Sequence, residues 1–77
     1  MDPHQTLCAT LARNLRAMRR ARRISQEQLA LFADIDRSYV SQIERGVANP
    51  SLRMLSALAT QLQVTVTQLL SDGGHDQ

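Results

Sequence analysis

The sequence is poor in aromatic residues: it has no tryptophan, and Phe32 and Tyr39 are its only aromatic side chains. Hydrophobic residues nevertheless make up 43% of the 77 residues, so we expect one small domain with an aliphatic core. Two aromatic side chains are also too few for the stacking platforms that bind single-stranded nucleic acids.

Paired cysteines and long apolar runs are also missing. The single cysteine, Cys8, cannot belong to a disulfide framework within the chain. Beside Leu7 and Leu11 it is interpreted as a small hydrophobic residue, with a reactive thiol as the alternative. No apolar run is long enough to span a membrane, and the N-terminal segment does not resemble a signal peptide. We therefore expect a cytoplasmic protein that does not bind membranes.

The sequence contains no arrangement of residues that is typical of an enzyme. Its two histidines, His4 and His75, lie near the ends of the chain. No acid–base pair and no set of metal ligands occurs at a recognisable spacing. We accordingly expect no catalytic activity, no metal or other cofactor and no small-molecule ligand.

Positive charge is concentrated in one part of the sequence. All nine basic residues are arginine, six of them lie between Arg13 and Arg23, and no acidic residue occurs between Asp2 and Glu27. The net charge of +2 therefore combines a basic N-terminal part with an acidic remainder. This asymmetry favours a polyanionic partner for one face of the protein, although an ordinary solvated helix surface is the alternative.

Helical periodicity is clearest near the N-terminus. Leu7, Leu11, Leu15 and Met18 are spaced by four, four and three residues, which is typical of an amphipathic helix. Most of the arginines of this segment fall on the opposite side of that helix. We therefore expect them to be exposed to solvent.

Capping residues divide the rest of the chain. Ser25 with Gln28, and Thr65 with Gln68, form two capping boxes that predict helix starts. Gly46 predicts a helix end. Together with the apolar spacing, these residues predict one all-α domain over residues 5–71. Its helices are expected over about residues 5–21, 26–33, 37–45, 51–62 and 66–70, followed by a disordered tail over 72–77.

The helices predicted over 26–33 and 37–45 are consecutive and are joined by three residues, which is the outline of a helix-turn-helix. Two such helices touch through small and apolar side chains. Residues of this kind stand at the expected contact positions, namely Leu29, Ala30, Ile35, Val40 and Ile43.

These residues lie within QEQLALFADIDRSYVSQIERG, which is followed by NPSLRMLSALATQLQVTVTQLL and preceded by LRAMR. Over about residues 11–70 the sequence resembles the Cro/cI (XRE) family of bacterial and phage DNA-binding domains. The part ADIDRSYVSQIERG is most similar to controller proteins of restriction–modification systems. The resemblance implies a five-helix, lambda-repressor-like fold. Asp34 departs from the family pattern, which has glycine there because the backbone tends to need a positive φ.

The resemblance also implies a function and the residues that carry it. It implies a sequence-specific transcriptional regulator that binds a palindromic operator in double-stranded DNA, with helix 37–45 in the major groove. The side chains expected to read bases are Arg37, Ser38, Ser41 and Gln42. The side chains expected to contact phosphates are Gln26, Tyr39, Arg45 and Asn49.

Some of these interpretations have open alternatives. Tyr39 can instead pack against the first helix of the pair. Arg16 and Arg20 are weaker candidates for phosphate contacts. The alternative function is a protein-interaction or antitoxin-like module with the same fold, but such a module should present apolar anchors where Arg37 and Gln42 stand.

Two predictions concern packing. Glu44 would repel phosphate on a DNA-facing surface, but it falls next to Ile43 on the inner side of its helix. Arg19 lies at the edge of its own apolar stripe, so we predict a structural salt bridge between Arg19 and Glu44. The last helix is rich in apolar residues for its length, which predicts a homodimer built on the last two helices. Its expected interface residues are Val66, Leu69 and Leu70.

Overall fold

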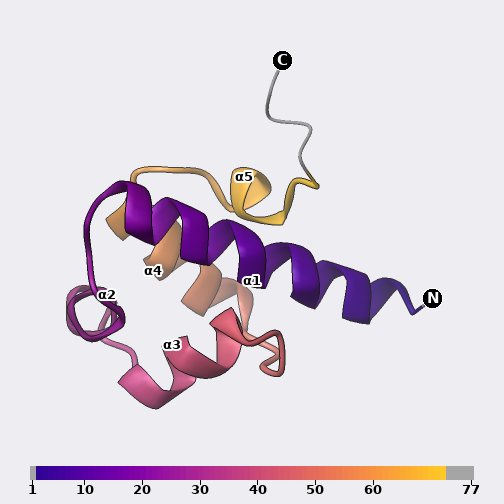
Figure 1. Cartoon of the computed structure of the whole chain (residues 1–77), viewed down its shortest axis with the longest axis horizontal. Coiled ribbons are helices and arrows are strands. Elements are labelled where there is room, and N and C mark those ends of the chain that lie inside the picture. Colours follow the sequence, from indigo (N-terminus) through magenta and orange to yellow (C-terminus); the bar gives the residue numbers. More distant parts are fainter. Residues whose placement is uncertain (1, 73–77) are drawn as a thin grey trace.

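The computed structural model describes residues 2–72, which form five α-helices (Figure 1). They are α1 (Pro3–Ala21), α2 (Gln26–Ala33), α3 (Arg37–Glu44), α4 (Leu52–Leu62) and α5 (Val66–Leu70). The predicted all-α class is therefore confirmed, and no strand occurs between residues 2 and 72. All but the first residue of the tail predicted over 72–77 lies outside the described residues.

Side-chain caps fix the helix starts. Ser25 and Thr65 form the two predicted capping boxes with Gln28 and Gln68. α1 begins at Pro3 rather than near residue 5. Asp2 is its N-cap, because the Asp2 carboxylate accepts a hydrogen bond from the backbone N–H of His4. Proline suits this first position because its ring has no N–H to satisfy.

Left-handed backbone conformations end several helices. Asp34 has φ 58° at the end of α2, as its place in the turn predicts, and Gly46 has φ 78° after α3. Arg23 and Gln63 also have φ 58°, after α1 and at the end of α4. The positive φ of these two residues was not predicted, since arginine and glutamine rarely adopt this conformation.

The core is aliphatic and lies among all five helices. α1 is the long helix across the molecule in Figure 1, with α5 along one side and α3 along the other. α2 packs against both α3 and α4. The largest side chains with less than 2% exposure are Leu15, Leu29, Val40, Ile43, Leu58, Leu62 and Leu69.

A buried polar side chain connects α1 to the end of α5. The amide nitrogen of Asn14 in α1 lies 2.8 Å from the backbone oxygens of both Leu69 and Ser71, and 3.4 Å from that of Gln68. These oxygens belong to the last turn of α5 and to its C-cap Ser71, where carbonyls lack intrahelical partners. Asn14 therefore caps a helix that is distant in sequence, a role that was not predicted.

Candidate nucleic-acid interface

α3 is seated by three buried residues, Val40, Ile43 and Glu44, and its other five residues are exposed or half-buried. Val40 and Ile43 point into the core and are 0% and 1% exposed. The four side chains predicted to read bases all lie outside the core, on the polar part of the helix. Of these, Arg37 and Ser38 are exposed, and Ser41 and Gln42 are half-buried.

The start of α3 lies beside the start of α2. The Asp36 carboxylate caps α3 by accepting hydrogen bonds from the Ser38 backbone N–H at 3.1 Å and the Ser38 hydroxyl at 3.0 Å. A depression of about 430 Å³ lies between the two helix starts, and Gln26 is on its wall with four residues of α3 and its cap. The structure thus brings one predicted phosphate contact next to three predicted base readers. The lining residues are Gln26, Asp36, Arg37, Ser38 and Ser41.

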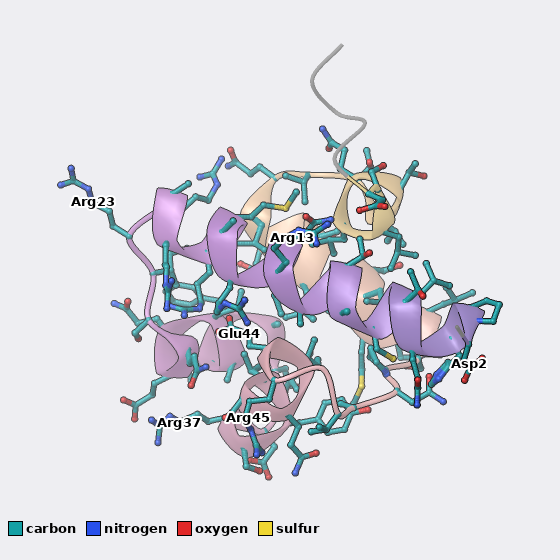
Figure 2. All side chains as sticks on the ribbon, turned by 45° about the vertical axis from the view of Figure 1, so that its right-hand side comes forward. Asp2, Arg13, Arg23, Arg37, Glu44 and Arg45 are labelled. Carbon is teal, nitrogen blue, oxygen red and sulfur yellow. The ribbon has the colours of Figure 1, made fainter. Side chains whose placement is uncertain are left out.

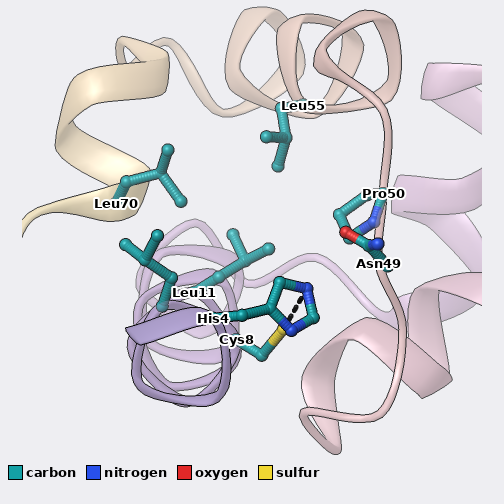
Figure 3. A pocket seen from close by; sticks show the side chains of 8 residues that line it. His4, Cys8, Leu11, Asn49, Pro50, Leu55 and Leu70 are labelled. Carbon is teal, nitrogen blue, oxygen red and sulfur yellow. Dashed lines mark hydrogen bonds between the residues drawn. The ribbon is translucent and has the colours of Figure 1, made fainter. Parts of the chain in front are cut away.

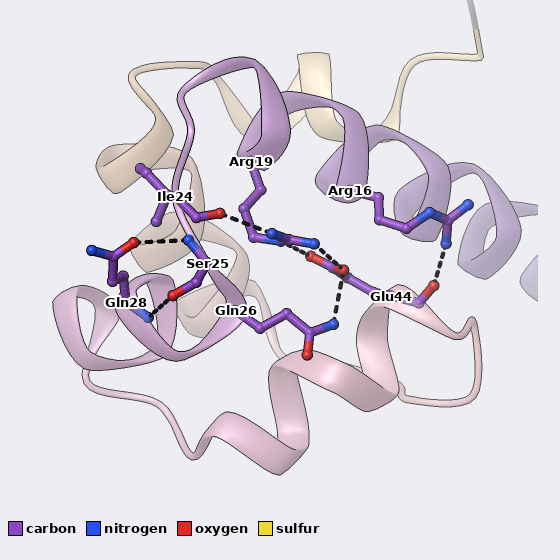
Figure 4. Close-up of polar contacts among 7 residues, drawn as sticks. All are labelled: Arg16, Arg19, Ile24, Ser25, Gln26, Gln28 and Glu44. Atoms are coloured by element: carbon purple, nitrogen blue, oxygen red, sulfur yellow. Dashed lines mark hydrogen bonds and ion pairs between the residues drawn. The ribbon is translucent and has the colours of Figure 1, made fainter.

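The predicted ion pair between Arg19 and Glu44 is present beneath this surface (Figure 4). Arg19 Nε and Nη2 donate to the two carboxylate oxygens of Glu44 at 2.6 and 3.0 Å. Arg19 Nη1 donates to the backbone oxygen of Ile24, and Gln26 Nε2 donates to Glu44 at 3.0 Å. The network therefore connects α1, the α1–α2 turn, the start of α2 and the end of α3.

Hydrogen bonds and neighbouring charges together decide the ionisation of this network. Burial alone would raise the pKa of Glu44, but the hydrogen bonds from Arg19 and Gln26 and the positive charges of Arg19 and Arg16 together outweigh it and hold that pKa below its ordinary value. The hydrogen bond to Glu44 raises the pKa of Arg19 in turn. Both groups are therefore charged at neutral pH, as a compensated pair.

A further contact holds the end of α3. The guanidinium of Arg16 donates to the backbone oxygen of Glu44 (Figure 4). The carbonyls of a last helical turn lack partners and carry partial negative charge. Arg16 therefore fixes α3 from α1, which the sequence did not indicate because the contact is made to backbone.

The remaining predicted phosphate contacts are dispersed. Arg45 is exposed at the end of α3 and points away from the body of the protein, as does Arg37 at the other end of α3 (Figure 2). The Tyr39 ring is half-buried and packs against the core, so packing, which was the alternative for this residue, accounts for the ring. Asn49 lies elsewhere, at a second hollow on the molecule.

That second hollow is apolar and has a volume of about 130 Å³ (Figure 3). It lies between the start of α1, the α3–α4 loop, α4 and α5. Cys8 lies on its wall, half-buried, with Sγ 3.6 Å from the backbone oxygen of Ala48 and 3.7 Å from His4 Nε2. The lining residues are His4, Leu7, Cys8, Leu11, Asn49, Pro50, Leu55 and Leu70.

The predicted dimer residues on α5 separate into two groups. Leu70 is half-buried and lines the apolar hollow, and Val66 is half-buried against the core. Leu69 is 0% exposed, so its assignment to an interface is wrong. It points inward, next to the last turn that Asn14 caps.

Two other kinds of site are absent from residues 2–72. No cluster of three or more His, Cys, Asp or Glu side chains is placed to hold a metal ion there. None of the described helices has the length and apolar character needed to cross a membrane.

Comparison with known proteins agrees with this arrangement. Residues 15–69 match the model of the helix-turn-helix family HTH_3. The chain belongs to this family. This XRE-type helix-turn-helix family consists of DNA-binding transcriptional regulators, so the family resemblance inferred from the sequence is confirmed.

Relatives within the family include both kinds of regulator to which the sequence was likened. The chain is 38% identical to the immunity repressor protein of Bacillus phage phi105 over 63 residues, which cover 82% of this chain and 44% of the repressor. It is 39% identical to the control protein C.SmaI of Serratia marcescens over 64 residues, which cover 83% of this chain and 76% of that protein.

A solved structure extends the similarity to the whole fold. The restriction–modification controller protein C.AhdI from Aeromonas hydrophila superimposes with a TM-score of 0.78 at 40% identity. The match covers 80% of this chain and 94% of C.AhdI. The five helices described above are thus those of an HTH_3 domain.

Proposed function

We propose that this helix-turn-helix protein is a sequence-specific transcriptional regulator that places α3 in the major groove of double-stranded DNA. The observation that carries the proposal is the orientation of α3. Val40 and Ile43 fix its inner side in the core, and Arg37, Ser38, Ser41 and Gln42 remain on its solvent side. A helix presented in this way fits the major groove, where each base pair has a distinct pattern of donors and acceptors.

The chemistry of the polar side chains suits base reading. The Arg37 guanidinium can donate two parallel hydrogen bonds to guanine, and the Gln42 amide can pair with adenine. The Ser38 hydroxyl already donates to Asp36, so towards DNA it acts as an acceptor. Ser41 has no such restriction and can donate to a base or a phosphate.

Phosphate contacts are proposed on both sides of α3. Gln26 uses one N–H of its side-chain amide for Glu44, which leaves the other N–H and the free backbone N–H groups of the α2 start for a phosphate. Arg45 is proposed to supply a contact at the other end of α3, and Asn49 a further one from the loop that follows α3. The hydroxyl of Tyr39 extends from its packed ring and is proposed to contact the DNA backbone.

We further propose that the protein acts as a homodimer on a palindromic operator. Two copies of α3 would then lie about 34 Å apart, one helical turn of DNA. The apolar hollow of Figure 3 provides the surface for a second copy. Leu7 is 48% exposed, and it lines the hollow together with the half-buried Leu70. Burial of these side chains by a second copy would remove apolar area from water.

The dimer proposal is tested by sedimentation at tens of micromolar protein. Leu7→Glu should yield monomer, because the new carboxylate would be buried at the interface without a partner. Leu31→Glu is the matched control, since Leu31 is 76% exposed on α2 and does not line the hollow. A wild-type protein that sediments only as monomer would contradict the proposal, as would dissociation by both variants.

The DNA-binding proposal is tested by selecting bound sites from duplexes with a randomised segment. We expect a palindromic site to be enriched at both low and high salt. Electrostatic, sequence-independent binding weakens strongly as salt rises, whereas base contacts maintain the preference. Recovery of all sequences alike would overturn the proposal.

A further inference from the structure

Two arginines at the end of α1 differ from their neighbours. Among the six arginines between residues 13 and 23, four have side chains that donate hydrogen bonds to other parts of the protein, whereas the side chains of Arg20 and Arg23 donate none within residues 2–72. Both are exposed. The four with partners are Arg13 (to Asp72), Arg16 (to the Glu44 backbone oxygen), Arg19 (to Glu44) and Arg22 (to the Leu62 backbone oxygen).

Arg23 is held in a conformation that arginine rarely adopts. Its φ is 58°, a region in which a side chain crowds the backbone and which favours glycine. The turn is closed around it, because its N–H donates to the Arg20 oxygen at 2.9 Å and the Ile24 N–H donates to the Arg19 oxygen at 3.1 Å. The backbone conformation therefore favours glycine over arginine at this position. The side chain extends away from the protein (Figure 2).

The position of Arg23 relates it to the DNA-binding surface. It lies two residues before Ser25, the N-cap of α2, and three before Gln26, a chain distance of at most about 10 Å. Gln26 lies on the depression that contains Arg37. In Figure 2 the side chains of Arg23 and Arg37 project on the same side of the molecule. The α1–α2 turn thus continues the surface beyond Gln26, in the direction away from α3.

Charge around the turn favours a polyanion. Glu27, in the first turn of α2, is the one acidic residue between Asp2 and Asp34. The stretch from Arg20 to Glu27 therefore keeps a net positive charge. Phosphates of a duplex held by α2 and α3 are the polyanion that this turn would meet.

We infer that Arg20 and Arg23 bind phosphates of the duplex that flanks the half-site read by α3. The flanks would then add affinity without adding base specificity. This inference rests on the proposed function, because it requires α3 to occupy the major groove. It gives a function to two arginine side chains that make no hydrogen bond within residues 2–72.

The inference is tested with two duplexes that share the selected site. One ends at the site, and the other extends it by about six base pairs of arbitrary sequence on each side. The dissociation constant is measured from 50 to 200 mM salt. Wild-type protein should bind the longer duplex more tightly, with a log–log salt slope steeper by about 0.9 for each added phosphate contact. Arg20→Ala and Arg23→Gly should each reduce this gain, and the double variant should abolish it.

Three variants separate charge from folding. Arg23→Gly removes the guanidinium and also suits the positive φ, so its melting temperature should equal or exceed that of the wild type. Arg23→Lys keeps the charge and should keep the flank gain. Arg53→Ala removes an exposed arginine from α4 and should also leave the gain unchanged.

The outcomes distinguish this inference from the proposed function. A wild-type protein that prefers the selected site but binds both duplexes with equal affinity and equal slope would overturn the inference alone. A flank gain that persists in the double variant would overturn it as well. Absence of any preference for the selected site would instead overturn the proposed function.

Discussion

The Arg19 guanidinium and the Glu44 carboxylate form a buried, two-point ion pair between residues 25 positions apart in the sequence. Gln26 donates to the same carboxylate, and Arg16 holds the backbone oxygen of Glu44. α1, the start of α2 and the end of α3 are therefore fixed as one unit. This unit and the core contacts of Val40 and Ile43 together orient α3 so that its polar side faces solvent.

Removal of one charge from this pair should destabilise the protein strongly. Glu44→Gln should lower the free energy of unfolding at pH 7 by about 3 kcal/mol, because Arg19 stays buried without its counter-charge. Urea unfolding measures the change. Glu27→Gln is the matched control, since Glu27 is exposed, and it should change stability by less than about 0.5 kcal/mol. Equal stability of the two variants would contradict this role of the ion pair.

The same pair predicts a dependence on pH. The pKa of Glu44 is lower in the folded protein than its ordinary value, so the unfolded chain takes up this proton first as pH falls. The stabilisation is complete above the ordinary glutamate pKa of about 4.3 and is lost as pH falls through the lower folded value. The stability difference between wild type and Glu44→Gln should therefore be constant near neutral pH and shrink in acid. A difference that persists undiminished down to pH 2 would contradict this account.

Asn14 provides an independent test of the packing of α5. Asn14→Ala should cost about 1–3 kcal/mol, because it leaves the carbonyls at the end of α5 without a donor. Asn14→Asp should cost more at pH 7, since it places a carboxylate against those same oxygens. Thermal unfolding gives both values, with the exposed Asn49→Ala as control. An Asn14→Asp variant as stable as Asn14→Ala would show that the amide does not act as a donor here.

Much of the fold is predictable because its determinants are local. Ser25 and Gln28 are three residues apart, and the apolar residues of α1 repeat at helical spacing, so helix starts and inner faces can be read directly. Asp2 and Pro3 also mark a helix start, although the predicted start lay near residue 5. The role of Asn14 could not be predicted, because its partners lie more than 50 residues away and are backbone atoms.

The turn between α2 and α3 carries strain that a substitution can relieve. Asp34→Gly should raise the free energy of unfolding by about 0.5–1 kcal/mol, because glycine adopts a φ of 58° without crowding. Gln63→Gly changes a residue with the same φ in another turn and should act in the same direction. Asp34→Ala should destabilise. If Asp34→Gly unfolds more readily than Asp34→Ala, the strain is not located at this residue.

The candidate interface was predictable in part. The outward positions of Arg37, Ser38, Ser41 and Gln42 follow from the periodicity of a helix that Val40 and Ile43 seat, whereas their base-reading role was implied by the family resemblance. The inner position of Leu69 could not be found in the same way. α5 has five residues, so periodicity does not distinguish Leu69 from its apolar neighbours, and tertiary packing decides. Arg16 and Arg20 were only weaker candidates because solvated arginines and arginines with partners look alike in a sequence.

Arg45 should contribute to DNA binding without contributing to base preference. Arg45→Ala should weaken binding to the selected duplex and to its single-base variants by the same factor, because a phosphate contact carries no direct sequence information. The log–log salt slope should become shallower by about 0.9 per subunit. Titrations at several salt concentrations measure both effects. Weaker binding to some base-pair variants but not to others would instead place Arg45 at a base.

The central claim is that α3 reads bases, and Arg37→Ala tests it most directly. Binding of the wild type and the variant is measured for the selected duplex and for a set of duplexes with every single base-pair change. The account predicts that Arg37→Ala loses about 1–3 kcal/mol of preference at one position of each half-site and keeps the wild-type preference elsewhere. An unchanged preference at every position, or an equal loss of affinity for all duplexes, would contradict it.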